Sequence, residues 1–177
     1  MIDQQVAELG ILLEILGRSG HPLDGEQLGQ VALSLAKVFG VDADEVAVLG
    51  VDSKERFLKF ILPEKLASIG TIPLSSNHAL AARTARERRA ELLNNFTASR
   101  HATVFEGVPL GRRQGQLIHK MMSAPILDGT RIVGVVQISR KGHSKSDSGP
   151  DFTQKDLRTL TSLSPTLIQF LNLSQAG

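Results

Sequence analysis

The stretch at residues 120–142, KMMSAPILDGTRIVGVVQISRKG, decides the fold. Two apolar runs flank Asp128-Gly129, a dipeptide that favours a tight turn between antiparallel strands. β-Branched residues crowd the second run, as in a strand that is covered on both faces or nearly so. Pro125 lies inside the first run and cannot donate a backbone hydrogen bond, so it requires an edge or a bulge. The stretch therefore predicts a buried β-hairpin.

Two amphipathic helices are predicted at the start of the chain. Residues 4–17 place apolar side chains at helical spacing, and a second helical stripe ends at Gly40. Asp24 is suited to cap the second helix, because Gln27 stands three residues later and can reach back to it. We therefore expect a helical hairpin over residues 1–41 that packs on the rest of the chain.

A second pair of strands follows these helices. The runs EVAVLGVD at residues 45–52 and RFLKFILP at residues 56–63 are rich in β-branched and aromatic residues, with turn-forming residues between them. We predict an antiparallel hairpin. Alternation in its second strand places on one face Leu58, Phe60 and Leu62, and on the other Phe57, Lys59 and Ile61.

The middle of the chain is less regular. Ser75, Ser76 and Asn77 are cap-type residues ahead of a run of helix formers, so we predict that a helix begins there. Residues 87–95 suit either the end of that helix or a short strand. Residues 97–117 contain three Gly, one Pro and few apolar residues, and we expect them to be mostly loop.

The closing helix completes the order of elements. Thr153 is suited to cap it with Asp156 as the third helical residue, and Pro165 is expected to kink it or to end its first half. The predicted order is two helices, two strands, a helix, a long loop, two strands and a helix. Short connections make both strand pairs antiparallel. The fold class is therefore α+β, with one antiparallel sheet, terminal helices on one face and the irregular middle segment on the other.

The later part of the chain resembles a GAF domain, a small-molecule sensing module related to PAS domains. The likeness is most specific over residues 118–171, with the strand SAPIL, a short turn, a strand of the RIVGVVQIS type with Gly134 near its middle, a polar loop and a closing helix. Residues 44–96 fit the earlier elements more loosely. The resemblance implies a GAF-like domain over residues 42–173, with a ligand chamber between the sheet and a lid at residues 69–119.

The resemblance also implies residues that line this chamber. Backbone amides at a helix start and cationic donors on the lid would suit an acidic or phosphate-like ligand. The candidate ligand-binding residues are Ser75, Asn77, Asn95, Arg100, His101, Ser123 and Val136. A charged cluster in a loop is more often simply solvated, and strands covered on both faces look this way without any ligand.

Cyclic-nucleotide-binding members of the family resemble one another in a signature of Asn-Lys, a variable gap, Phe, three residues and Asp-Glu. The corresponding residues are Ser139-Arg140, Phe152 and Asp156-Leu157, so the Asn and the Glu are missing. The ligand is therefore left unknown, with a cyclic nucleotide as one candidate. We expect an ion pair between Arg140 and Asp156, although Asp156 is also placed to cap the last helix.

Composition restricts the cofactors. The chain has no cysteine, which excludes Cys-ligated metals and, by the resemblance, covalent bilin attachment and the chemistry of GAF-type methionine sulfoxide reductases. The histidines show no paired metal-ligand spacing. A GAF domain can hold haem through one histidine, for which His78, His101 or His119 would serve, but no second signal supports haem. We expect no metal and no enzymatic activity.

Charge and hydropathy restrict the partners. A net charge of only +2 and the absence of Tyr and Trp argue against nucleic acid. Without a signal peptide or a membrane-spanning run, we expect a cytoplasmic protein. Two functions remain: a sensory domain that relays ligand binding through its terminal helices, or a ligand-free dimerisation module. A homodimer would use apolar stripes that pack partly across a two-fold axis, formed by Leu9, Leu12, Leu16, Leu28, Val31, Leu35, Leu160, Leu167 and Leu171.

Overall fold

The computed structural model describes residues 2–96 and 116–175. The helices are α1 (Ile2–Gly17), α2 (Gly25–Phe39), α3 (Leu80–Glu87), α4 (Gln154–Leu163) and α5 (Leu167–Gln175). The strands are β1 (Val46–Val51), β2 (Phe57–Leu62), β3 (Thr71–Pro73), β4 (Glu91–Leu93), β5 (Leu117–Asp128) and β6 (Arg131–Gly142). They form one antiparallel sheet in the order β3-β2-β1-β6-β5-β4. The predicted α+β class is confirmed.

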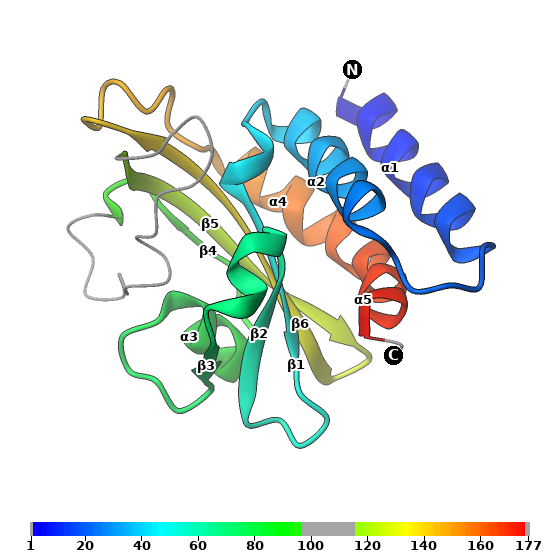
Figure 1. Ribbon diagram of the computed structural model, residues 1–177. Coiled ribbons are helices and arrows are strands. Elements are labelled where there is room, and N and C mark those ends of the chain that lie inside the picture. The colour runs from blue at the N-terminus through cyan, green and yellow to red at the C-terminus, as the bar shows by residue number, and fades with distance from the viewer. Residues whose placement is uncertain (1, 97–115, 176–177) are drawn as a thin grey trace.

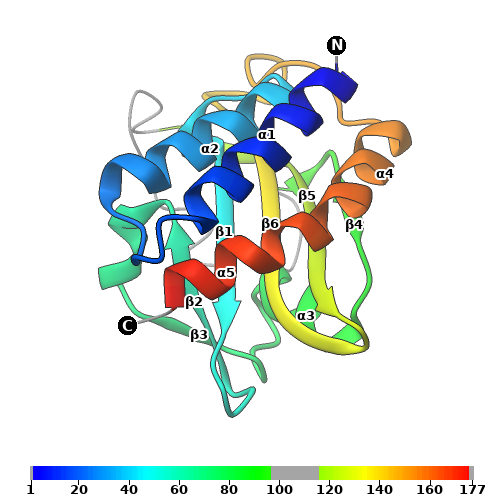
Figure 2. The same ribbon diagram turned by 90° about the vertical axis from the view of Figure 1, so that its right-hand side faces the viewer.

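The sheet separates two layers of different thickness. The helices α1, α2, α4 and α5 cover one face, whereas α3 lies against the other (Figures 1 and 2). We call these faces the helical face and the α3 face. The longest strands, β5 and β6, lie side by side in the sheet, so the hairpin predicted from residues 120–142 contributes to both layers.

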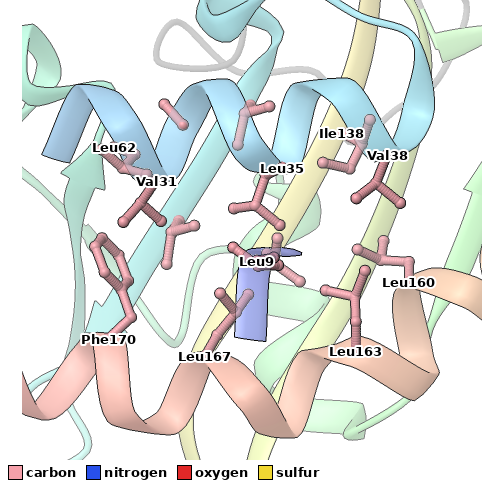
Figure 3. Packing of buried hydrophobic residues seen from close by; sticks show 14 of the residues in the cluster. Leu9, Val31, Leu35, Val38, Leu62, Ile138, Leu160, Leu163, Leu167 and Phe170 are labelled. Atoms are coloured by element: carbon pink, nitrogen blue, oxygen red, sulfur yellow. The ribbon is translucent and has the colours of Figure 1, made fainter. Parts of the chain in front are cut away.

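The larger core fills the space under the helical face. Leu9 of α1, Leu35 of α2 and Leu167 of α5 point toward one another there (Figure 3), and all three side chains are fully buried. They pack with residues from the strands in one continuous cluster. Burial of this much apolar surface is the main stabilising contribution in a domain of this size.

Both predicted capping boxes are present. Gln27 N donates to Asp24 Oδ1 over 2.9 Å and Asp24 N donates to Gln27 Oε1 over 3.0 Å. Thr153 and Asp156 make the same reciprocal pair at the start of α4. The expected break at Pro165 is a short 3-10 turn, Ser164–Thr166, between α4 and α5. Local backbone chemistry thus positions three of the four helices on the helical face.

The β5–β6 hairpin closes with a two-residue turn. Asp128 pairs with Arg131, and Gly129 has a φ of 65°, a conformation that favours glycine. Pro125 pairs with Val135 of β6, and the pairing of β4 with β5 ends at Ser123. Pro125 therefore lies where β5 has a partner strand on one side, which agrees with the predicted edge position.

The face prediction for β2 is wrong at one residue. The pairing of β1 with β2 shifts by one residue at Ile61, since Val48 pairs with Leu62 and Leu49 pairs with Phe60. Leu62 consequently packs in the core of the helical face, whereas Phe60 packs on the α3 face. Strict alternation assumes an unbroken register, which a β-bulge interrupts.

The middle segment contains elements that its composition did not predict. β3 forms an edge strand on β2, and α3 begins at Leu80 rather than beside Ser75 or Asn77. Residues 87–95 hold a strand: α3 ends at Glu87, Arg88 adopts a φ of 51°, and β4 follows. Most of the predicted loop lies outside the described residues. None of the helices in the described ranges is long and apolar enough to cross a membrane.

Candidate ligand-binding face

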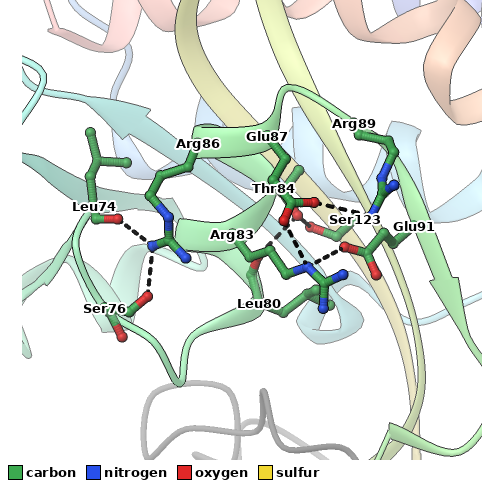
Figure 4. A network of polar contacts seen from close by, with 10 residues as sticks. All are labelled: Leu74, Ser76, Leu80, Arg83, Thr84, Arg86, Glu87, Arg89, Glu91 and Ser123. Carbon is green, nitrogen blue, oxygen red and sulfur yellow. Dashed lines mark hydrogen bonds and ion pairs between the residues drawn. The ribbon is translucent and has the colours of Figure 1, made fainter.

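A chain of buried hydrogen bonds joins α3 to the sheet. Gln137 Nε2 donates to Ser123 Oγ over 3.2 Å, and Ser123 Oγ lies 2.7 Å from Thr84 Oγ1. Thr84 Oγ1 in turn donates to the carbonyl oxygen of Leu80 over 2.9 Å. A hydroxyl has one proton to give, so Ser123 is the donor to Thr84 and all the bonds run in one direction. Figure 4 shows Thr84 and Ser123 facing each other across the interface.

Strand register explains how these side chains meet. Ser123 of β5 and Gln137 of β6 are direct cross-strand partners, so their side chains leave the same face of the sheet. Thr84 belongs to α3, which packs over that face. All three residues are buried, and buried polar groups are tolerated when they satisfy one another.

The polar row continues along alternate residues of β6. Ser139 Oγ donates to the carbonyl oxygen of Glu45 over 3.2 Å, and the backbone N of Lys141 donates to the Glu45 carboxylate over 2.6 Å. The backbone N of Asp42 donates to the same carboxylate over 2.9 Å. The α3 side of β6 is therefore polar at positions 137, 139 and 141, whereas residues 136 and 138 point to the other face and join the apolar core.

An apolar patch borders this polar row. Leu80, Phe96, Ile118 and Met121 form a separate buried cluster with Leu93 packed against it. Phe96 is 2% exposed. Apolar surface beside a few convergent polar groups is the usual composition of a small-molecule site.

Arginines on α3 hold the edges of this region in place. Arg86 donates to the carbonyl oxygens of Leu74 and Ser76 over 2.5 and 2.7 Å, which fastens the loop before α3 (Figure 4). Arg83 forms an ion pair with Glu91 of β4 over 3.1 Å. Arg86 is exposed, whereas Arg83 is half-buried.

The predicted ligand-binding residues are only partly brought together. Ser123 is the one described candidate inside the polar cluster. Ser75 and Asn77 are exposed in the loop before α3. Asn95 is also exposed and accepts a hydrogen bond from Lys145 Nζ over 2.5 Å. Arg100 and His101 lie outside the described residues.

Val136 does not line the α3 face. It is fully buried in the core of the helical face, where it pairs with Val48 of β1 and Ala124 of β5. Adjacent residues of a strand point to opposite faces, so Gln137 occupies the place that was assigned to Val136. The alternation of polar and apolar residues in VVQISRK indicates that Gln137, rather than Val136, lies on the polar face of the strand.

Arg140 and Asp156, the predicted ion pair, each interact with other residues. Arg140 donates to the carbonyl oxygens of Phe39 and Gly40 over 3.2 and 3.3 Å, and its guanidinium lies 4.7 Å from the centre of the Phe152 ring. The Asp156 carboxylate accepts from the backbone N of Thr153 in the capping box. The contact between β6 and the start of α4 is therefore Arg140 over Phe152, rather than the predicted ion pair.

Two of the three histidines considered for haem lie in the described ranges. Of these, His78 is exposed, and one ring nitrogen of His119 lies 2.9 Å from the carbonyl oxygen of Gly142.

An open groove of about 600 Å³ lies beside the β1–β2 hairpin, where Arg56, Lys59 and Glu64 contribute to its lining. Of the predicted ligand-binding residues, the five in the described ranges do not line this groove.

We compared the chain with protein-family models and its architecture with solved structures. A family model described as GAF domain matches residues 22–172. The GAF domain of an Acinetobacter phosphoenolpyruvate-protein phosphotransferase is 12% identical with a TM-score of 0.68, over 99% of this chain and 96% of that one. Free methionine-R-sulfoxide reductase from Neisseria meningitidis, solved with its substrate, is 14% identical with a TM-score of 0.66, over 99% and 90%. The A. aeolicus nlh2 GAF domain in an inactive state is 17% identical with a TM-score of 0.63, over 98% and 97%.

These results differ in what they establish. At such low identities the solved structures show a shared fold, and a shared fold does not determine an activity. No curated protein matches the chain. The family model, by contrast, spans most of the sequence, from before α2 into α5. The chain belongs to the GAF domain family.

Proposed function

We propose that this protein is a sensory or regulatory domain that binds a small molecule on the α3 face of its sheet. The observation that carries the proposal is the row of buried polar groups around Thr84, Ser123 and Gln137, beside the apolar patch of Phe96 and Met121. Core packing alone favours apolar side chains at such positions, because an unpaired buried polar group costs about 1–3 kcal/mol.

The same strands supply a route from this face to the terminal helices. Ser123 and Gln137 face α3, while their neighbours Met122 and Val136 pack in the core with the helices of the opposite layer. A ligand that shifts β5 or β6 would therefore disturb the packing of α4 and α5. Such a ligand changes the populations of two conformations only if it binds one of them more tightly.

A ligand-free module is the alternative, and one observation favours it. Thr84, Ser123 and Gln137 already bond to one another, so they form a complete structural link without a ligand. Catalysis by a cysteine is not available in either case, because the chain contains none.

A thermal-shift screen of the whole chain distinguishes the two functions. The panel consists of cyclic nucleotides, other nucleotides, haem and acidic metabolites. A ligand present at about a hundred times its dissociation constant stabilises the folded state by about 2.7 kcal/mol, which raises the melting temperature measurably. A flat response over the whole panel would favour the ligand-free module.

Variants then locate the site for any ligand that binds. Ser123→Ala and Gln137→Leu should weaken binding by roughly tenfold or more, as expected when a hydrogen bond to the ligand is lost. Ser164→Ala is the matched control, since Ser164 is a buried serine that donates to Thr161 in the helical layer. Binding that both variants leave unchanged would place the ligand elsewhere, for instance in the groove beside Arg56.

A further inference from the structure

The open groove beside the β1–β2 hairpin lies on the opposite side of the sheet from the α3 face. Phe57 and Lys59 of β2 line it, whereas the intervening Leu58 packs in the core of the α3 face. Leu28 of α2 and Ser174 of α5 form part of its walls. Its volume of about 600 Å³ is in the range of small-molecule sites. The groove is therefore separate from the site proposed on the α3 face.

Strand pairing places Lys59 in the middle of the groove floor. Its cross-strand partners are Gly50 of β1 and Thr71 of β3, and both of them line the groove. Paired residues of antiparallel strands direct their side chains to the same face, so Thr71 lies beside the lysine on that face. Gly50 has no side chain, which leaves space on the other side. The exposed Lys59 side chain therefore extends over the floor of the groove.

The charges that line the groove are not balanced. Asp52 and Arg56 form an ion pair over 3.3 Å. The Glu64 carboxylate lies at the start of α2, since its Oε2 would stand 2.9 Å from a Cβ atom at Gly25, and a helix N-terminus favours a negative charge. The ammonium group of Lys59 has neither an ion pair nor a hydrogen bond with another side chain in residues 2–96 and 116–175. The uncompensated charge in the groove is therefore positive.

Apolar side chains form much of the remaining lining. Leu28, Phe57 and Ile61 are half-buried there. The guanidinium of Arg56 lies 5.3 Å from the centre of the Phe57 ring, which adds N–H donors to the same strand face as Lys59. Cationic donors beside half-exposed apolar walls suit an anion on an apolar body, because the walls cover the body while the donors bind the charge.

We propose that this groove is a binding site for a small organic carboxylate with an apolar body, and that Lys59 selects the charge. The floor of the groove belongs to the sheet, and its walls include residues of α2 and α5. A bound carboxylate therefore contacts both the sheet and the helical layer. The site shares none of the polar residues that were proposed to bind a ligand on the α3 face, so either site can exist without the other.

Nuclear magnetic resonance of the isotope-labelled full chain locates the binding. The probe is cinnamate, an aromatic carboxylate, and its uncharged amide, cinnamamide, is the comparison. Cinnamate should shift the backbone amide signals of Gly50, Lys59 and Thr71 with a dissociation constant of about 1 mM or lower, at least about fivefold tighter than cinnamamide. Unchanged signals at these residues, equal affinity for both compounds, or shifts at Ser123 and Gln137 instead would overturn the proposal.

The variant Lys59→Gln tests the selection of charge. It should weaken cinnamate binding by about fivefold and leave cinnamamide binding within about twofold of wild type. Lys54→Gln is the matched control, because Lys54 is an exposed lysine in the turn of the same hairpin and does not line the groove. Thermal unfolding checks that both variants are folded. If the two variants lost cinnamate affinity equally, general surface charge would explain the binding and the role of Lys59 would be overturned.

Discussion

Gly134 of β6 lies directly opposite Gly50 of β1 in the sheet. A Cβ atom added to Gly134 would stand 2.5 Å from the backbone oxygen of Leu49 and 2.8 Å from Leu171 Cδ1 of α5. The absence of a side chain there lets α5 pack closely on the strand. The glycine in the middle of the RIVGVVQIS run thus has a steric reason within this domain.

Replacing Gly134 with Ala should therefore destabilise the protein. The nearest neighbour is a backbone oxygen that a rotamer change cannot move, so we expect a loss of about 1–3 kcal/mol in the free energy of unfolding. Urea denaturation measures it. Gly29→Ala is the control, because a Cβ at Gly29 in α2 would have no neighbour within 4 Å and should stabilise by about 0.5–1 kcal/mol. A neutral Gly134→Ala would mean that α5 packs less closely than described.

Asn94 joins the end of β4 to the start of α4. Its Oδ1 accepts from the backbone N of Phe152 over 2.9 Å, and its Nδ2 donates to the carbonyl oxygen of Phe152 over 3.0 Å. Asn94→Ala leaves both backbone groups of Phe152 without this partner, and should cost about 1–3 kcal/mol of stability. Asn95→Ala is the matched control, since Asn95 is exposed and should change stability by less than about 0.5 kcal/mol. Equal effects in denaturant unfolding would count against a special role for Asn94.

The elements with local signals could be predicted from the sequence. The β5–β6 hairpin has its turn dipeptide, and α2 and α4 have their capping boxes, so short segments specify them. β3 could not be predicted in this way, because three residues become a strand only when β2 offers its edge. The bulge at Ile61 has the same origin, since it depends on pairing between β1 and β2 rather than on either strand alone.

The candidate site shows the same limit. Ser123 could be proposed from its place in the family-like hairpin, but Thr84 was missed because its partner lies far away in the sequence. Gln137 was missed for a different reason. In VVQISRK the polar residues 137 and 139 alternate with apolar ones, which indicates that Gln137 lies on the polar face of the strand. The assignment of Val136 to the ligand overlooked this period of two.

Arg140 should contribute to stability through its shape as well as its charge. The guanidinium covers the Phe152 ring while donating to two carbonyl oxygens at the end of α2. Arg140→Met should lower the free energy of unfolding by about 2 kcal/mol, and Arg140→Lys should recover only part of it, because an ammonium cannot span both carbonyls while stacking. Arg131→Met, which removes an exposed ion pair with Asp128, should cost less than about 1 kcal/mol. Full recovery by Lys would show that charge alone matters.

Asp52 gives the β1–β2 turn a dependence on pH. Its carboxylate accepts hydrogen bonds from the backbone N of Phe57 over 2.9 Å and the backbone N of Arg56 over 2.5 Å, and the Arg56 Nε lies 3.3 Å away. These contacts, the Phe57 amide foremost, hold the pKa of Asp52 below its ordinary value of 3.8. The charged carboxylate therefore stabilises the folded state at neutral pH.

The direction in which stability changes with pH determines how the contribution of Asp52 can be measured. Because the pKa is lower in the folded state, the stabilisation is complete above pH 3.8 or so and is lost as the pH falls through the folded value. Asp52→Asn removes the charge, so its stability deficit relative to wild type should be largest near neutral pH and should shrink below about pH 4. Urea unfolding across this range measures it. Asp128→Asn, at the turn of the other hairpin, is the control, because Asp128 is exposed and its ion pair with Arg131 spans 3.7 Å. A deficit for Asp52→Asn that stays constant with pH would mean that the carboxylate charge adds nothing to the turn.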